Sequence, residues 1–205
     1  MDSILLATSN PHKLVEVTEI LGPLGFDVLG LDDLGLSIPE PVEDAPTFEG
    51  NARLKAIHYA AATGRACLAD DSGLEVDALG GAPGVLSARY SGVTGPREQR
   101  DQANNRKLIQ ELQGVPEEDR SARFVCAMCL ASPDGSLIAE SRGTFGGFIV
   151  DSPRGANGFG YDPHLLVPEL GMTSAELAPE EKNARSHRGR ATRQIADLVG
   201  GHAGS

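Results

Sequence analysis

The chain has 205 residues, of which 40% are hydrophobic and 23% charged, a composition that suits a folded protein able to bury a core of its own. Its 18 Lys and Arg residues against 29 Asp and Glu residues give a net charge of −11, which repels an extended polyanion. Nucleic-acid polymers are therefore excluded as expected partners. A small anionic ligand is not excluded, because it needs only a few convergent cations and backbone N–H groups.

Short apolar runs alternate with helical patterns in the first third of the chain. Asn10 and Pro11 suit the cap and first turn of a helix, whereas Thr47 and Gly64 suit the two ends of an Ala-rich helix. The elements predicted here are, in chain order, a strand at 4–7, a helix from 11 to about 21, a strand at 26–31, an acidic loop at 32–45 and a helix at 48–63.

The rest of the chain contains a block of strands between helical segments. The predicted elements are strands at 66–69 and 74–79 around a turn at 70–73, a polar helix from 96 to about 113, strands at 124–131, 137–141, 143–150 and 164–167, and helices from about 174 and 186. Helices between strands at both ends, with a hairpin block in the middle, predict one α/β domain over residues 1–205, with a mixed central sheet flanked by helices.

Neither a membrane span nor a disulfide framework is apparent in the sequence. No apolar stretch reaches the roughly 18 residues of a membrane span, and the apolar segment after Met1-Asp2-Ser3 lacks the length of a signal peptide. Cys126 and Cys129 form a C-x-x-C pattern, but residues three apart on a strand face opposite sides, so we interpret them as packing residues. We expect a reduced protein of the cytoplasm with no membrane partner.

The junction of the first strand and first helix is a candidate anion site. Thr8, Ser9 and Asn10 precede free N–H groups at the positive end of the helix dipole, and Lys13 in the first turn can add its ammonium group. The P-loop pattern G-x-x-x-x-G-K-[ST] is absent. A phosphate site and an ordinary capped helix both fit these residues.

Acidic residues suggest a divalent cation. Asp70 and Asp71 repel each other unless one is solvated or a cation lies nearby, so a metal site and a solvated turn both fit them. On an extended backbone their side chains point to opposite sides. Asn51 and Lys55 share a helix face, where Lys55 either contacts phosphate or is solvated, and Glu43 belongs to a loop that either supplies metal ligands or is simply charged.

Two further segments are candidates for binding a base. Phe159, Tyr161 and Asp162 lie among glycines, which fits either a stacking platform or a tight turn with its rings in the core. A dense basic patch fits either a ligand site or a helix start capped by Ser186. This patch comprises Lys182, Ser186, His187, Arg188 and Arg190.

In their order along the chain, these segments resemble the inosine triphosphate pyrophosphatases, often called the Ham1-like family. The resemblance implies two lobes around a nucleotide-binding cleft, Mg²⁺ as cofactor, a homodimer, and hydrolysis of ITP, dITP and XTP to the monophosphate and pyrophosphate. The matching stretches are 7–13, 47–52, 69–74, 80–84, 87–92, 158–163, 181–182 and 186–189.

The resemblance also implies roles for single residues. Asp71 corresponds to the catalytic proton acceptor and a Mg²⁺ ligand, and Glu43 to a second ligand, although Asp44-Ala45 follows it where relatives often have Thr-Gly. Ser72 corresponds to a residue that touches substrate. The implied triphosphate site consists of Thr8, Ser9, Asn10, Pro11, His12, Lys13, Asn51 and Lys55. The implied base pocket consists of Phe159, Gly160, Tyr161, Asp162, Lys182, His187 and Arg188.

Donors in the basic patch favour deaminated purines. They suit the O6 acceptor of hypoxanthine or xanthine and leave the amino group of adenine without an acceptor. One alternative is a Maf-like pyrophosphatase for modified pyrimidine nucleotides, against which the Ser-His-Arg patch and Phe159 argue. The other is a nucleotide-binding regulator without turnover, against which Asp71 argues, because a pure binder gains nothing from a metal-ready carboxylate.

Overall fold

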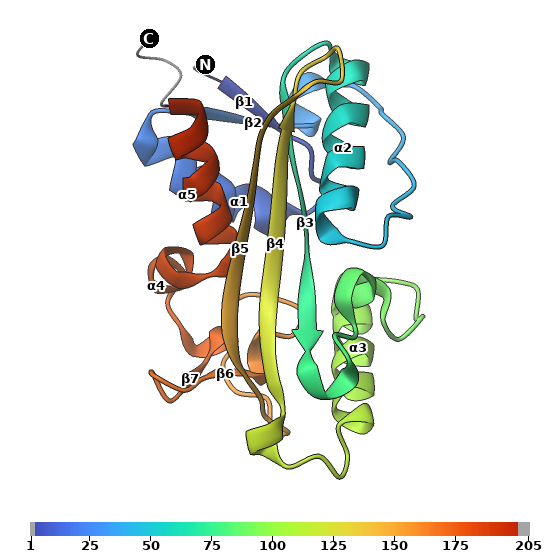
Figure 1. Ribbon diagram of the computed structural model, residues 1–205, viewed down its shortest axis with the longest axis vertical. Helices are drawn as coiled ribbons and strands as arrows, with labels where there is room; N and C mark the ends of the chain where they lie inside the picture. Colours follow the sequence, from blue (N-terminus) through green and yellow to red (C-terminus); the bar gives the residue numbers. More distant parts are fainter. Residues whose placement is uncertain (1–2, 201–205) are drawn as a thin grey trace. The chain divides into compact units, whose positions relative to one another are not determined.

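The computed structural model describes residues 3–200, so Met1, Asp2 and residues 201–205 of the predicted domain lie outside the described residues. Figure 1 shows the elements along the chain. The strands are β1 (Ser3–Leu6), β2 (Asp27–Gly30), β3 (Cys67–Val76), β4 (Ser121–Ala131), β5 (Leu137–Ile149), β6 (Leu165–Val167) and β7 (Met172–Thr173). The α-helices are α1 (Pro11–Leu21), α2 (Phe48–Thr63), α3 (Arg97–Glu111), α4 (Pro179–Arg185) and α5 (His187–Gly200).

The strands between residues 3 and 200 form a seven-stranded sheet in the order β2-β1-β3-β4-β5-β6-β7. β1 pairs in parallel with β2 and β3, whereas β6 pairs antiparallel with β5 and β7. Both kinds of pairing occur in one sheet with helices between strands, so the predicted α/β class with a mixed sheet is confirmed. No helix within the described range is long and apolar enough to cross a membrane.

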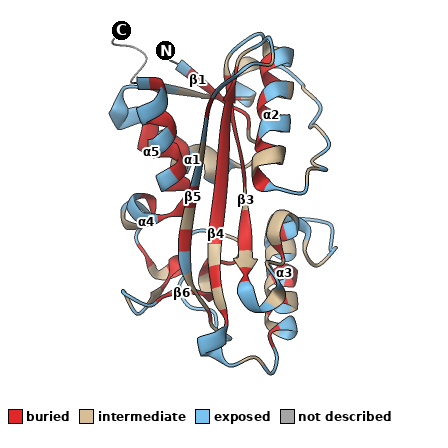
Figure 2. Cartoon of the chain, viewed as in Figure 1, coloured by how far each residue is buried: buried red, intermediate tan, exposed pale blue. Residues whose placement is uncertain are grey.

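Contacts divide the chain into two compact units, each with its own apolar core. Unit 1 comprises the described residues of Met1–Asp71, Cys126–Gly143 and Ser186–Ser205, and unit 2 comprises Ser72–Val125 and Thr144–Arg185. β4 is buried over most of its length, as Figure 2 shows. The single domain over residues 1–205 stays a prediction. Core residues of unit 1 include Leu6, Leu21, Met128 and Ile195, and those of unit 2 include Leu74, Leu108, Phe145 and Leu165.

Helix boundaries in unit 1 follow their capping residues. The Asn10 side chain accepts a hydrogen bond from the His12 N–H at 3.1 Å, and Pro11 opens α1. The Thr47 side chain accepts from the Gly50 N–H at 3.1 Å, and α2 ends at Gly64 in a left-handed conformation. The predicted boundaries of α2 are therefore confirmed at both ends.

The sequence prediction was wrong about β3. A turn was expected at residues 70–73, but one strand runs from Cys67 to Val76. Asp70 and Asp71 are 2% and 8% exposed, and each forms an ion pair within unit 1. Because cations partner both carboxylates, the backbone does not have to turn outward to bring them to water.

Smaller differences occur near the C-terminal end and in the hairpin. The helix expected from about Ser174 is a short 3₁₀ turn, Ser174–Glu176, and α4 begins only at Pro179. The capping box at Thr173 fixes where this turn begins. β5 is continuous where two strands were expected, and β7 was not predicted because two residues carry no periodicity.

Candidate active site

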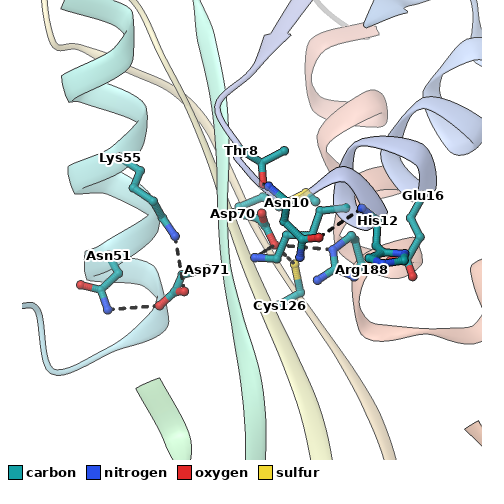
Figure 3. Close-up of polar contacts among 12 residues, drawn as sticks. Thr8, Asn10, His12, Glu16, Asn51, Lys55, Asp70, Asp71, Cys126 and Arg188 are labelled. Carbon is teal, nitrogen blue, oxygen red and sulfur yellow. Dashed lines mark hydrogen bonds and ion pairs between the residues drawn. The ribbon is translucent and has the colours of Figure 1, made fainter. Parts of the chain in front are cut away.

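The Asp71 carboxylate lies beside α2, and Figure 3 shows it pointing toward Asn51 and Lys55. Asn51 Nδ2 donates a hydrogen bond to Asp71 Oδ2 at 3.1 Å, and Lys55 Nζ lies 3.4 Å from Asp71 Oδ1. The spacing of four residues places both partners on one face of α2. Thr47 fixes where α2 begins, so the cap sets the position of the two side chains that hold Asp71.

Lys55 also connects Asp71 to the acidic loop. Its ammonium lies 3.2 Å from Glu43 Oε2, and the Asn51 Oδ1 atom accepts a hydrogen bond from the Ala45 N–H at 3.0 Å. The second contact holds the loop that carries Glu43 against the start of α2. Glu43 and Asp71 thus face a common cationic position, which the Lys55 ammonium marks.

Burial and charge act in opposite directions on this group. Burial raises the pKa of the Asp71 carboxyl above its ordinary value, and this effect exceeds the lowering by Lys55. Burial acts to lower the pKa of Lys55, but the carboxylates of Asp71, Asp70 and Glu43 outweigh it and raise that pKa. On the Asp71 side of the strand, the negative charge of the carboxylates therefore exceeds the positive charge of Lys55.

The donor set fits a divalent cation that takes further ligands from a substrate. Mg²⁺ in nucleotide enzymes is commonly held by one or two carboxylates together with phosphate oxygens and water. Glu43 and Asp71 supply two carboxylates that converge on one position. Residues 3–200 contain no group of three or more His, Cys, Asp or Glu side chains that could hold a metal. A metal bound here would depend on the phosphates to complete its coordination.

Asp70 points to the other side of β3, toward α1 and α5 (Figure 3). Its Oδ2 atom lies 2.9 Å from Lys13 Nζ and 3.5 Å from Arg188 Nε, and the Cys126 thiol donates a weak hydrogen bond to it at 3.7 Å. Arg188 Nη1 donates to the Glu16 carboxylate. Burial acts to raise the pKa of Asp70, but Lys13 and Arg188 outweigh it and hold that pKa well below its usual range.

The segment before α1 is a capped helix start that also presents Lys13. Thr8 Oγ1 accepts a hydrogen bond from the Asn10 N–H at 3.2 Å, and Asn10 accepts from the His12 N–H. The Ser9, Pro11 and His12 side chains are exposed. The structure shows the cap, while the use of this segment for phosphate stays a prediction.

A second group of predicted site residues lies in unit 2, around Asp162. Its Oδ2 atom accepts hydrogen bonds from the Phe159 N–H and from Lys182 Nζ, both at 2.7 Å, and its Oδ1 atom accepts from Ser174 Oγ at 2.7 Å. Gly158 has a φ of +75°, and a Cβ atom there would lie 2.1 Å from Asp162 Oδ2. The loop can therefore close around Asp162 only with glycine at this position.

The two aromatic rings of this loop have different environments. Tyr161 is 5% exposed, and its hydroxyl donates to the Ser87 carbonyl at 2.8 Å, so its ring belongs to the core of unit 2. The Phe159 ring is half-buried, with the Arg97 guanidinium 4.4 Å and the Lys182 ammonium 5.3 Å from its centroid. Of the two sequence interpretations, Tyr161 follows the core alternative.

The architecture and these groups of residues match known proteins over nearly the whole chain. Residues 4–198 match the model of the Ham1 family. The chain belongs to the Ham1 family. It is 53% identical over 197 residues to the dITP/XTP pyrophosphatase of an Exiguobacterium species, a match that covers 96% of each chain. It is 50% identical over 198 residues to the dITP/XTP pyrophosphatase of Nitratidesulfovibrio vulgaris, covering 96% of this chain and 95% of that one.

A solved structure supports the same membership. The Ham1 protein from Coxiella burnetii has a TM-score of 0.86 and 39% sequence identity, and the match covers 98% of this chain and 100% of that one. The predicted resemblance to the Ham1-like family is therefore confirmed.

This Ham1-family chain brings some of its predicted site residues together and separates others. In unit 1, Glu43, Asn51, Lys55 and Asp71 form one contact group, and Lys13 and Arg188 meet at Asp70. In unit 2, Phe159, Asp162 and Lys182 form another group, while Ser72 is half-buried in β3. His187 and Arg188 open α5 in unit 1, where the Ser186 hydroxyl accepts from the Gly189 N–H at 3.0 Å.

Sequence reasoning missed several partners of these residues. Glu16 accepts a hydrogen bond from Arg188, which lies 172 residues away in the sequence, so no local spacing pointed to this contact. Three residues of α3 that contact the Phe159 loop were also missed, although they recur every four positions on one helix face. These residues are Arg97, Asp101 and Asn105.

Proposed function

We propose that the chain hydrolyses ITP, dITP and XTP to the monophosphate and pyrophosphate, and so removes deaminated purine nucleotides from the nucleotide pool. Its relatives at 53% and 50% identity carry the name dITP/XTP pyrophosphatase. The observation that carries the proposal in this chain is the Asp71 carboxylate, which is buried, held by Asn51 and Lys55, and accompanied by Glu43.

Cationic groups of unit 1 would bind the triphosphate. Lys13 and Lys55 supply ammonium groups that are 15% and 11% exposed at their side chains, and the N-terminal end of α1 adds its dipole. Thr8, Ser9 and Asn10 would place their backbone and side-chain donors at the same end. These contacts carry no information about the base, so they would serve every nucleoside triphosphate alike.

Glu43 and Asp71 would hold Mg²⁺ together with phosphate oxygens. When bound, Mg²⁺ offsets negative charge on the triphosphate and polarises water. Asn51 keeps Asp71 Oδ2 in place through its 3.1 Å hydrogen bond, so the carboxylate is held in one orientation.

Asp71 would accept the proton of the attacking water. The water oxygen forms a bond to phosphorus while the bond between the monophosphate and pyrophosphate breaks, and the proton passes to an Asp71 oxygen and then to solvent. Burial raises the pKa of the metal-free Asp71 carboxyl, but a divalent cation beside it would keep it ionised, so Asp71 would act mainly by orienting the attacking water. Lys55 would balance the charge of the carboxylates before substrate and metal arrive.

Residues of unit 2 would read the base. Phe159 offers a half-buried ring for stacking, and Lys182 offers a buried cationic donor that Asp162 fixes at 2.7 Å. A donor suits the O6 atom of hypoxanthine or xanthine and opposes the amino group of adenine. That Gly160, Tyr161, His187 and Arg188 also line the base pocket stays a prediction.

The cytoplasm and a homodimeric state belong to the same proposal. The three cysteines are free and buried, which agrees with a reducing compartment. A Maf-like pyrimidine specificity is not favoured, because the named relatives act on purine nucleotides, and a regulator without turnover is not favoured, because those relatives are named as pyrophosphatases.

The test is a panel of nucleoside triphosphates assayed for pyrophosphate release with and without Mg²⁺. We expect ITP, dITP and XTP to be hydrolysed at least about 100-fold more efficiently than ATP, because a site of donors leaves the adenine amino group unpaired. EDTA should abolish turnover, and Mg²⁺ should restore it. Orthophosphate as the first product, or equal efficiency with ATP, would contradict the proposal.

A further inference from the structure

Helix α3 contacts the Phe159 loop through three side chains on one face. Arg97, Asp101 and Asn105 are spaced four residues apart, which aligns them along the helix. Asp101 Oδ2 accepts a hydrogen bond from the Gly160 N–H at 3.1 Å, and Asn105 Nδ2 donates to the Gly160 carbonyl at 3.0 Å. Both backbone polar groups of Gly160 are thus bound by α3.

Arg97, on the same face of α3, contacts the aromatic ring of Phe159. Its guanidinium carbon lies 4.4 Å from the centroid of Phe159. Its Nε atom is buried without a hydrogen-bond partner in the described range, and it lies 3.5 Å from Asp101 Oδ2 as an ion pair. The ring and the Asp101 charge therefore orient this guanidinium, and Asp101 connects the contact on the ring with the contact on the backbone.

The other side of the loop is fixed independently of α3. The Phe159 N–H donates to Asp162, which is also bound to Lys182 and Ser174. Asp162 determines where the Phe159 backbone lies, but it makes no hydrogen bond that would set the angle of the ring. The Arg97 guanidinium lies nearer to the ring than the Lys182 ammonium, at 4.4 Å against 5.3 Å from its centroid, and together with the two bonds to Gly160 it supplies that restraint.

We propose that Arg97, Asp101 and Asn105 are positioning residues for base recognition, because they hold Phe159 in the orientation in which it stacks on a purine. The inference rests on the proposed function and deepens it at the base end of the site. A base–aromatic contact depends on ring orientation, so an unrestrained Phe159 would bind the base more weakly while the phosphate contacts of unit 1 stay as they are.

The experiment compares Arg97→Ala with Arg97→Lys, which keeps a cation near the ring, and with Arg106→Ala, which removes an exposed cation from the same helix. Steady-state kinetics with ITP and the inhibition constant of inorganic tripolyphosphate, which has no base, are measured for each protein. For Arg97→Ala we expect KM for ITP to rise about 10-fold, with kcat within about 2-fold and the tripolyphosphate constant unchanged. Arg97→Lys should recover most of the loss, and Arg106→Ala should resemble the unmodified chain.

A double-mutant cycle separates positioning from a general loss of structure. In a Phe159→Ala background there is no ring to orient, so adding Arg97→Ala should leave KM for ITP unchanged. An equal rise in both backgrounds, or a parallel rise in the tripolyphosphate constant, would overturn the inference. Asp101→Asn keeps an acceptor for the Gly160 N–H and provides a second variant if Arg97→Ala does not fold.

The proposed function is judged separately, on the unmodified chain. If that chain releases no pyrophosphate from ITP, the proposed activity fails, and equilibrium binding of ITP to the same set of variants then tests the positioning role. If it releases pyrophosphate but Arg97→Ala binds ITP normally, only the positioning role fails.

Discussion

Asp70 and Asp71 are neighbours on β3, but their environments on the two sides of the strand shift the pKa of the carboxyl group in opposite directions. Asp70 faces two cations, Lys13 and Arg188, and its pKa is lowered against the effect of burial. Asp71 faces one cation, Lys55, which Glu43 shares, and burial raises its pKa. A carboxylate with excess positive charge around it serves to hold its partners, whereas one with too little can accept a proton or a further cation.

The largest expected effect is on the Asp70 side and concerns stability. Asp70→Asn leaves Lys13 and Arg188 without their shared counter-charge in a site that is 2% exposed. Removing one partner of a buried ion pair commonly costs about 3–5 kcal/mol, because the remaining charge stays buried. The free energy of unfolding from urea denaturation should fall by that order. A change within about 0.5 kcal/mol would show that water reaches these cations and that Asp70 is not needed to balance them.

The next effect is on the Asp71 side and concerns turnover. Asp71→Asn keeps the shape of the side chain but removes its charge and its capacity to accept a proton, so kcat for ITP should fall by about 100-fold or more. Nucleotide should still bind, because Lys13, Lys55 and the start of α1 remain. The measurements are kcat and equilibrium binding of ITP, with circular dichroism to confirm folding. Near-normal turnover in a folded protein would mean that another carboxylate carries the reaction.

These two sides also differ in how far the sequence could predict them. Thr47 and Gly64 are local signals, so α2 and the shared face of Asn51 and Lys55 could be placed from the sequence. The continuation of β3 through Asp70 could not, because it depends on Lys13 and Arg188, which the fold brings from distant parts of the chain. Local patterns predict elements and caps, whereas the neutralisation of a buried charge is a tertiary property.

In unit 2, too, the sequence predicted local structure but not tertiary contacts. Glycines around Phe159 indicated a tight loop, and the loop is present. Which ring would be buried was not predictable, because Tyr161 enters the core through a hydrogen bond to Ser87, a residue far away in sequence. The contact of Arg97 with Phe159 likewise joins two segments with no shared local signal.

A smaller effect is expected on substrate binding, to which we assign cations from both sides of β3. Lys13→Ala removes an ammonium that we assign to phosphate, so KM should rise by about 10-fold for ITP, dITP and XTP alike, with the ratio between them unchanged. Arg53→Ala is a matched control, since Arg53 is an exposed cation of α2 that pairs with Glu140 and should leave KM unchanged. A rise confined to one base would move Lys13 from the phosphates to the base.

The smallest expected effect is the change in the free energy of unfolding caused by Asp71→Asn. Unlike Asp70→Asn, this substitution is not expected to destabilise the fold strongly. When folding raises the pKa of a carboxyl, the folded state binds its proton more tightly than the unfolded state does. The contribution of this group to stability therefore decreases as the pH rises through the folded-state pKa. Above that pKa the ionised Asp71 therefore opposes folding, and asparagine removes this cost. Asn at this position can still accept a hydrogen bond from Asn51, and Lys55 keeps Glu43 as a partner.

We expect the free energy of unfolding at pH 7, in the absence of nucleotide and Mg²⁺, to stay within about 1 kcal/mol of the unmodified chain or to increase. A loss comparable with that of Asp70→Asn would mean that both carboxylates stabilise the fold, and the division of roles between the two sides of β3 would then be wrong.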